Sequence, residues 1–341
     1  MKKDLLHDFI AIITLSSKNN TYKFALARSI LDYVKKNEDQ IIENIKNNLS
    51  TQITYSEIAK SFLKYYWHQE FKFKIKQNHQ VDKPPSMIVI LQKIFDKEVI
   101  PEKFDFVLKE QKNEAEKLIL HKVFGKEKQK TSQVIPRFQN IREGKITVNK
   151  TPFYINKEND QLIQVNFDAM KFFIHYRVLL EKLVILEWAK FLEKIKPVPG
   201  LVSKIEDPEP ERKSLKTIEK EFLKFFNECF YCSRDLIDTK IHIDHFIPWS
   251  YIFEDKRWNF VLSCSECNLK KSNSLTKSNF LEKIIQRNYD YIKKLPLLKK
   301  SLIDLDEGLG WEKEIRRHYR NCKEYGFSEI KLENQYLRQK K

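Results

Sequence analysis

Four of the five cysteines in this 341-residue chain form two Cys-x-x-Cys pairs, and 31 residues separate the pairs. The first pair is Cys229 and Cys232, and the second is Cys264 and Cys267. Four thiolates at such spacings can close a tetrahedral zinc site. Unrelated thiols or redox pairs are the alternative, but two matching pairs arise rarely by chance among five cysteines. Because a closed four-cysteine site has no open position, we expect the zinc ion to hold structure and to take no part in a reaction.

The segment between the cysteine pairs holds the polar residues best suited to catalysis. Ile241 and Ile243 alternate with His242 and Asp244, a pattern that predicts a strand with one apolar face. Asp244 and His245 then fall where this strand ends. An imidazole can accept a proton from water near neutral pH, and a carboxylate can hold a divalent cation.

Two further elements are expected to complete this unit. A second strand is predicted at 259–262, and a helix is expected to begin near Asn268 and to continue through Lys271. Asn268 stands directly after the second cysteine pair. Asp244, His245 and Asn268 are therefore expected to converge at one edge of a strand–strand–helix unit.

Residues 1–195 are expected to form a mainly helical domain that selects or positions a substrate. Apolar residues recur at helical spacing at 26–34 and at 56–67. The longest helical candidate spans 168–195, and its apolar residues leave little of its surface polar. A helix that is apolar on most sides is normally buried, so we expect 168–195 to be the core helix of this domain.

Two stretches of this domain depart from helical spacing. Residues 71–76 alternate strictly between apolar residues and lysines, which predicts a strand with one lysine face. Such a strand could lie against a phosphate backbone, but a half-buried strand or a helix end with a solvated face is the simpler interpretation. Residues 145–165 could form a small antiparallel insertion.

A linker is expected at 196–214, because a stretch rich in proline and charge cannot build a core. The second domain then spans 215–341. It is expected to open with a short amphipathic helix within 215–228, to hold its core motif at 229–273 and to end in C-terminal helices. The predicted fold class is α+β and predominantly α.

The chain carries 63 Lys and Arg against 47 Asp and Glu, a net charge of +16 that is spread over both domains. A positive field of this size suits a polyanion, either nucleic acid or an anionic membrane surface. No run of about 18 apolar residues is present, so no transmembrane helix is expected. No glycine-rich phosphate-binding motif points to nucleotide hydrolysis. We expect the protein to be cytoplasmic and its partner to be nucleic acid.

Residues 229–273 resemble the HNH endonuclease family, whose members share a ββα-metal finger. The resemblance rests on Asp244-His245, on Asn259 in the second strand and on Asn268 in Cys-Asn-x-x-Lys, flanked by both cysteine pairs. Each piece alone is a weak signal, whereas the combination is specific. The resemblance covers a small part of the chain.

The resemblance implies a role for each of these residues. His245 is the general base that activates water, and Asp244 and Asn268 bind one catalytic Mg²⁺ or Mn²⁺ ion. Asn259 steadies the loop that holds the histidine. The last position of the family's motif is a histidine, and Asn268 is a known variant that shifts the site toward hard ions with a preference for oxygen ligands.

The remaining residues give weaker signals. Lys270 and Lys271 are candidate contacts for the substrate phosphate on the same resemblance. A basic cluster at 316–320 could contact a nucleic-acid backbone, although charge runs are usually solvated faces. His242 is expected to be a surface residue, with an extra metal ligand or a DNA contact as the alternative. Cys322 is expected to be an ordinary buried thiol.

The reaction that the resemblance implies is metal-dependent hydrolysis of DNA, leaving 5′-phosphate and 3′-hydroxyl ends. One such unit cuts one strand at a time, so duplex cleavage needs a homodimer or two successive nicks. We expect a restriction or phage-defence enzyme that acts on double-stranded DNA, by analogy with the family. A non-catalytic zinc DNA-binding module, an RNA-cleaving toxin or effector and a homing endonuclease are the alternatives.

Overall fold

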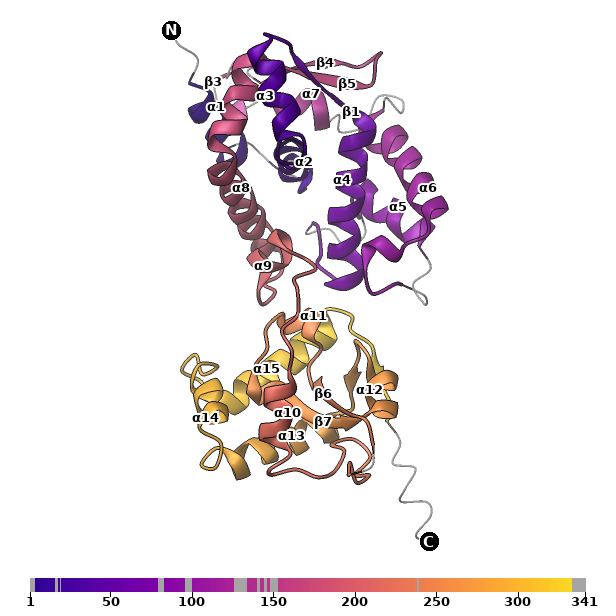
Figure 1. The fold of residues 1–341 in the computed structure, drawn as a ribbon, viewed down its shortest axis with the longest axis vertical. Helices are drawn as coiled ribbons and strands as arrows, with labels where there is room; N and C mark the ends of the chain where they lie inside the picture. Colours follow the sequence, from indigo (N-terminus) through magenta and orange to yellow (C-terminus); the bar gives the residue numbers. More distant parts are fainter. Residues whose placement is uncertain are drawn as a thin grey trace. The chain divides into compact units, whose positions relative to one another are not determined.

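The computed structural model describes residues 4–15, 18, 20–78, 83–95, 100–125, 134–139, 142–143, 146–147, 153–237 and 239–332. The chain divides into two compact units, Met1–Glu209 and Pro210–Lys341. Both are built mostly from helices, with a few short strands, so the fold class is α+β and predominantly α (Figure 1).

The first unit is a helical assembly with one small sheet. Its α-helices are α1 (Leu5–Thr14), α2 (Tyr22–Lys36), α3 (Glu38–Lys46), α4 (Tyr55–Trp67), α5 (Ser86–Ile94), α6 (Lys109–Ile119), α7 (Val134–Phe138), α8 (Phe167–Ile195) and α9 (Leu201–Glu206). Shorter helical turns are η1 (His68–Lys72), η2 (Phe104–Phe106) and η3 (Leu120–Phe124). Its strands are β1 (Thr51–Thr54), β2 (Arg142–Glu143), β3 (Ile146–Thr147), β4 (Tyr154–Lys157) and β5 (Leu162–Val165).

The core of this unit lies between α2, α4 and α8. Helix α8 packs along α2, and the ring of Trp188 stacks on Phe24 with their centroids 6.2 Å apart. Trp188 is fully buried together with Val184 and Leu180, which lie one and two turns earlier. The long helix expected at 168–195 is confirmed.

The expectation that α8 is buried on most sides is wrong for its middle turns. Tyr176, Val178, Leu179 and Leu186 are exposed, two of them by more than half of their surface. The packed face of α8 is wide enough for only some of its apolar residues. Single exposed leucines are common on soluble proteins.

The strand expected at 71–76 is also wrong. The backbone N–H of Phe73 donates to His68 O at 3.0 Å, and that of Ile75 donates to Gln69 O at 2.7 Å. Both donors therefore return to the end of the preceding helix, and the stretch has no ladder to a neighbouring strand. The structure therefore does not support a strand with a lysine face that lies along a phosphate backbone.

The small sheet contains the antiparallel pair expected within 145–165. Strands β4 and β5 pair antiparallel, and residues 145 and 148–152 of that range lie outside the described residues. Strand β1, from far earlier in the chain, pairs with β5 with Ile53 opposite Ile163 and gives the order β1-β5-β4. The sequence pattern did not reveal this third strand, because its partner lies far away along the chain.

Part of the expected linker is folded onto the first unit. Leu201 and Ile205 of α9 are buried, and α9 packs against α8. The Arg28 guanidinium donates to the carbonyl of Glu206 at 2.9 Å. The part of the expected linker that does not pack on the first unit is therefore shorter than 196–214, because apolar residues between the prolines pack α9 against α8.

The second unit contains α10 (Lys216–Phe222), β6 (Ile241–His245), α11 (Trp249–Ile252), η4 (Arg257–Asn259), β7 (Phe260–Cys264), α12 (Ser265–Lys271), β8 (Leu275–Thr276), α13 (Ser278–Tyr291), α14 (Pro296–Ile303), α15 (Trp311–Glu324) and β9 (Glu329–Ile330). Strands β6 and β7 form an antiparallel hairpin, β8 and β9 pair in parallel, and α12 packs on the hairpin. In the part of the chain that is described, no helix has both the length and the apolar character needed to cross a membrane.

Candidate active site

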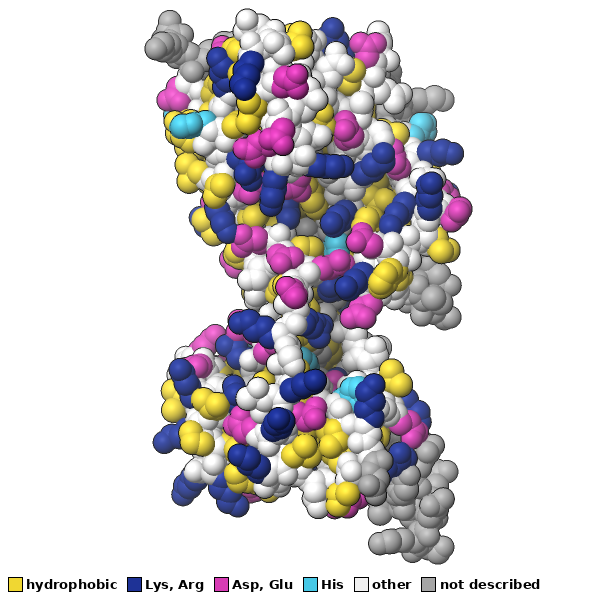
Figure 2. Space-filling view, viewed as in Figure 1, with side chains coloured by type: hydrophobic (Ala, Val, Ile, Leu, Met, Phe, Trp, Pro, Cys, Tyr) yellow, Lys and Arg dark blue, Asp and Glu magenta, His cyan; other side chains and the backbone are white. Residues whose placement is uncertain are grey.

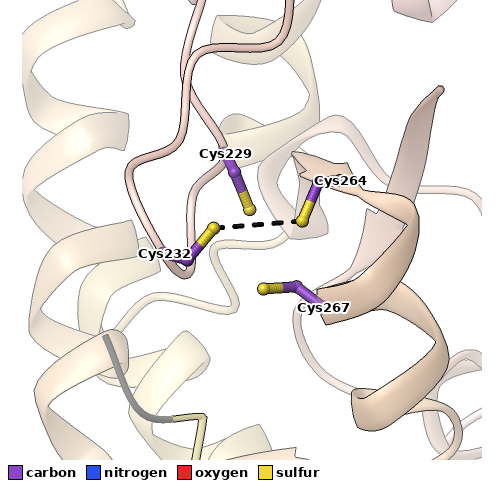
Figure 3. A group of neighbouring side chains, drawn as sticks. All are labelled: Cys229, Cys232, Cys264 and Cys267. Atoms are coloured by element: carbon purple, nitrogen blue, oxygen red, sulfur yellow. Dashed lines mark hydrogen bonds between the residues drawn. The ribbon is translucent and has the colours of Figure 1, made fainter. Parts of the chain in front are cut away.

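The four paired cysteines meet at one point of the second unit. Their Sγ atoms all lie within 4.8 Å of one another, and all four side chains are buried. Figure 3 shows Cys229 and Cys232 reaching from one loop toward Cys264 and Cys267. Cys264 ends β7 and Cys267 lies in the first turn of α12.

This cluster has the dimensions of a tetrahedral zinc site. Zn–S bonds of about 2.3 Å place neighbouring sulfurs about 3.8 Å apart, and the Sγ atoms of Cys232 and Cys264 are 3.9 Å apart. The hydrogen bond from Cys267 lowers the pKa of Cys229 to about 4. A lowered pKa favours the thiolate, which is the form of cysteine that binds metal. Four sulfur ligands leave no open position, so an ion held here is structural.

The β6–β7 hairpin carries this cluster at one end and the candidate catalytic residues at the other. Ile241 pairs with Cys264 at the cluster end, whereas Asp244 pairs with Val261 and His245 with Phe260 at the far end. Helix α12 starts at the cluster and packs on both strands. The last turn of α12 therefore comes back to the level of Asp244.

Asp244 is a buried carboxylate with two partners from different elements. The hydroxyl of Tyr231 donates to Oδ2 at 2.5 Å, and Nζ of Lys271 lies 3.1 Å from the same oxygen. Lys271 Nζ also donates to the carbonyl of His245 at 2.7 Å. We expected Lys271 to contact a substrate phosphate. Its complete burial and its pairing with Asp244 favour a role in holding this carboxylate instead.

Asn259 ends the η4 turn directly before β7, and not in the second strand as expected, and it fixes the chain that follows His245. Its side chain is fully buried and makes two hydrogen bonds with Ile247, accepting from the backbone N–H and donating to the carbonyl, each at 2.8 Å. The Asn259 carbonyl also accepts from the N–H of Phe246 at 2.8 Å. The two residues after His245 are thus held by one asparagine.

Asn268 lies in the middle of α12, three residues before Lys271, and not near the start of the helix as expected. Residues at this spacing share one side of a helix, and Lys271 reaches Asp244. Asn268 is therefore on the side of α12 that faces the end of β6. Asn268 is partly exposed.

His245 has a partner that sequence reasoning missed. Its Nε2 lies 2.9 Å from Oδ1 of Asp255, and its ring meets Phe260 edge to face with centroids 4.8 Å apart. The hydrogen bond from His245 lowers the pKa of Asp255. The only sequence signal for Asp255 is an acidic residue in the loop between the strands. Tyr231 was also missed, although it is the one side chain with a hydroxyl between the first two cysteines.

The other candidates lie away from Asp244. Nε2 of His242 lies 3.0 Å from the hydroxyl of Ser265. Lys270 is exposed and pairs with Glu266 at 2.8 Å, one turn earlier on α12. Cys322 is buried, as expected. Neither Lys270 nor His242 is close enough to Asp244 to share a hydrogen bond with it in the part of the chain described.

The basic cluster at 316–320 is largely neutralised within the unit. Arg316 pairs with Glu282 and Glu312, and Arg317 pairs with Glu307 and Glu314. Arginines with two carboxylate partners each are poorly placed to bind phosphates. This finding weakens the interpretation of α15 as a nucleic-acid contact.

The cysteine cluster predicts that the purified protein carries about one zinc ion per chain. Cys267→Ser should lose most of that zinc and the cooperative unfolding of the second unit, because binding energies of about 10–16 kcal/mol make such folds depend on the metal. Cys322→Ala is the matched control and should keep its zinc. Elemental analysis with circular dichroism measures both, and full zinc content in Cys267→Ser would contradict the assignment.

The neighbouring lysines of α12 give a paired prediction. Lys271→Met leaves the buried carboxylate of Asp244 without its cation and should lower the free energy of unfolding by about 3–5 kcal/mol. Lys270→Met removes an exposed charge and should leave stability unchanged. Urea unfolding of the zinc-loaded proteins measures the difference. Equal stability of the two variants would show that Lys271 is free for another role.

Comparison with known proteins identifies two families along the chain. Residues 229–276 match the family model described as HNH endonuclease. Residues 4–102 match the model described as Domain of unknown function (DUF8808). Among curated proteins and solved structures, none matches the chain. The segment 229–276, which holds the zinc-type cysteine cluster, the β6–β7 hairpin and α12, is therefore an HNH endonuclease domain.

Proposed function

We propose that the protein is a metal-dependent endonuclease that hydrolyses phosphodiester bonds of double-stranded DNA. The observation that supports this proposal is a neighbouring Asp244 and His245 at one end of a hairpin whose other end holds four cysteines, with Asn268 on the helix that packs on this hairpin. The match of the same segment to HNH endonucleases supports it. A neighbouring carboxylate and histidine can supply a metal ligand and a base, which a non-catalytic zinc module does not require.

The residues at this end of the hairpin suit a hard divalent cation. The Asp244 carboxylate and the Asn268 amide offer oxygen ligands, which Mg²⁺ and Mn²⁺ prefer. Oδ1 of Asp244 has one distant contact, Lys271 Nζ at 3.4 Å, and so it has lone pairs to offer. An ion held there would supply Lewis acidity at the phosphate and would stabilise the leaving oxygen. Two protein ligands leave room for water and substrate.

The role of His245 in this proposal is to take a proton from water. The imidazole accepts one proton as the water oxygen forms a bond to phosphorus. The bond between phosphorus and the 3′ oxygen breaks, and that oxygen leaves with a proton from solvent. The products carry a 5′-phosphate and a 3′-hydroxyl. Asn259 serves the reaction by fixing the loop after His245, and Lys271 serves it by holding Asp244.

Charge and chemistry support a nucleic-acid substrate in the cytoplasm. The net charge of +16 favours a polyanion. Figure 2 shows Lys and Arg side chains interspersed with Asp and Glu over the visible face of both units. Four thiolates remain free to bind zinc in a reducing compartment, which the cytoplasm provides.

We assign the first unit to substrate selection and the whole protein to restriction or phage defence. This assignment extends the nuclease proposal by analogy with the family. One site of this kind cuts one strand, so duplex cleavage would use a homodimer or two successive nicks.

The proposal predicts that zinc-loaded protein nicks supercoiled plasmid with Mg²⁺ or Mn²⁺ and does not with EDTA. His245→Ala should lower the rate about 10²- to 10⁴-fold, the usual contribution of a general base. His242→Ala removes the neighbouring histidine of the same strand and should leave the rate unchanged. Equal zinc content must be shown for all three proteins.

The alternatives give different outcomes in the same assay. Cleavage of a matched RNA but not of DNA would identify an RNA-cleaving effector. Retention of DNA with no cleavage of either substrate would contradict the nuclease proposal and favour a binding module. Cleavage that survives His245→Ala would refute the role of His245.

A further inference from the structure

The imidazole ring of His245 is hydrogen-bonded to a carboxylate. The side chain is only 9 % exposed, and Nε2 lies 2.9 Å from Oδ1 of Asp255. The edge-to-face contact with Phe260 fixes the plane of the ring. The last residue of β6 is therefore met by a carboxylate from the loop that joins β6 to β7.

The charge state of Asp255 determines which ring nitrogen carries the proton. The hydrogen bond from His245 lowers the pKa of Asp255, and the positive charges of Arg212 and Lys213 add to this effect. An ionised carboxylate only accepts hydrogen bonds. Nε2 must therefore bear the hydrogen, and in a neutral imidazole Nδ1 is then the nitrogen with the free lone pair.

A constrained turn precedes Asp255 in this loop. Phe253 adopts a left-handed conformation with φ 63°, which is unusual for a bulky residue. The ring of Phe253 packs on the ring of Trp249 with centroids 4.4 Å apart. The guanidinium of Arg212 lies over the Trp249 ring, 3.9 Å from its centroid. Such conformations persist where the surrounding contacts demand them, often at functional sites.

We propose that Asp255 is a positioning residue that holds His245 in the Nε2–H tautomer and so makes Nδ1 the nitrogen that receives the proton from water. This inference rests on the proposed function. Asp255 itself stays ionised throughout. The proton passes from water to Nδ1, and the resulting imidazolium keeps its Nε2–H bond to Asp255, now strengthened by charge.

The kinetic test compares three substitutions in one loop. Asp255→Asn presents an amide N–H to Nε2 and favours the wrong tautomer, so kcat for plasmid nicking should fall about 10- to 100-fold with KM unchanged. Asp255→Glu keeps the carboxylate and should recover part of the rate. Glu254→Gln is the matched control, because Glu254 pairs with Lys256 instead, and it should behave as the wild type.

An unchanged kcat in Asp255→Asn would overturn the proposal. A higher kcat would also overturn it, because it would show that Asp255 hinders His245 as a base. A raised KM at unchanged kcat would place Asp255 in substrate binding, which also contradicts it.

A spectroscopic test separates this proposal from the nuclease activity itself. In zinc-loaded protein labelled with ¹⁵N-histidine, the His245 signals are those that His245→Ala removes. We expect the Nε2–H tautomer in the wild type and a shift toward Nδ1–H in Asp255→Asn. A wild-type Nδ1–H tautomer would refute the positioning role even if DNA is cleaved. The expected tautomers without any cleavage would leave the pairing of Asp255 with His245 intact and would remove only the nuclease proposal.

Discussion

The convergence of four thiols at one end of the β6–β7 hairpin is the constraint on which the second unit depends. Each cysteine pair also carries, or leads into, a side chain that reaches Asp244. Tyr231 lies between the first two cysteines, and Lys271 ends the helix that begins at the second pair. The cysteine cluster and the Asp244 carboxylate thus lie at the two ends of one hairpin. A zinc ion bound by both cysteine pairs would also hold Tyr231 and Lys271, the two partners of Asp244, in position.

Burial of Asp244 explains why these partners are needed. A carboxylate removed from water loses several kcal/mol of hydration unless a cation and hydrogen bonds compensate. The ammonium of Lys271 and the hydroxyl of Tyr231 provide that compensation. Lys271 also binds the carbonyl of His245, so one buried lysine connects the two neighbouring residues of the motif. The same low-dielectric setting would strengthen the hold of Asp244 on a divalent ion.

Sequence reasoning was most successful where spacing alone sets the structure. The cysteine pairs, the alternation at 241–244 and the long apolar helix each predicted an element that the structure contains. It failed where distant residues decide the outcome. The alternation at 71–76 predicts a strand, but backbone N–H groups of this stretch donate to the end of the helix before it. The pairing of β1 with β5 joins segments a hundred residues apart. The burial of Lys271 and the contact of Asp255 with His245 depend on how a loop folds back, which no local pattern encodes.

The central claim is that water, activated beside Asp244, attacks a DNA phosphate. The most direct measurement is cleavage of a defined duplex in H₂¹⁸O under single-turnover conditions, followed by mass analysis of the fragment ends. Our account predicts one ¹⁸O atom in the new 5′-phosphate and an unlabelled 3′-hydroxyl. Label in a 3′-phosphate, or fragments without any label, would contradict it.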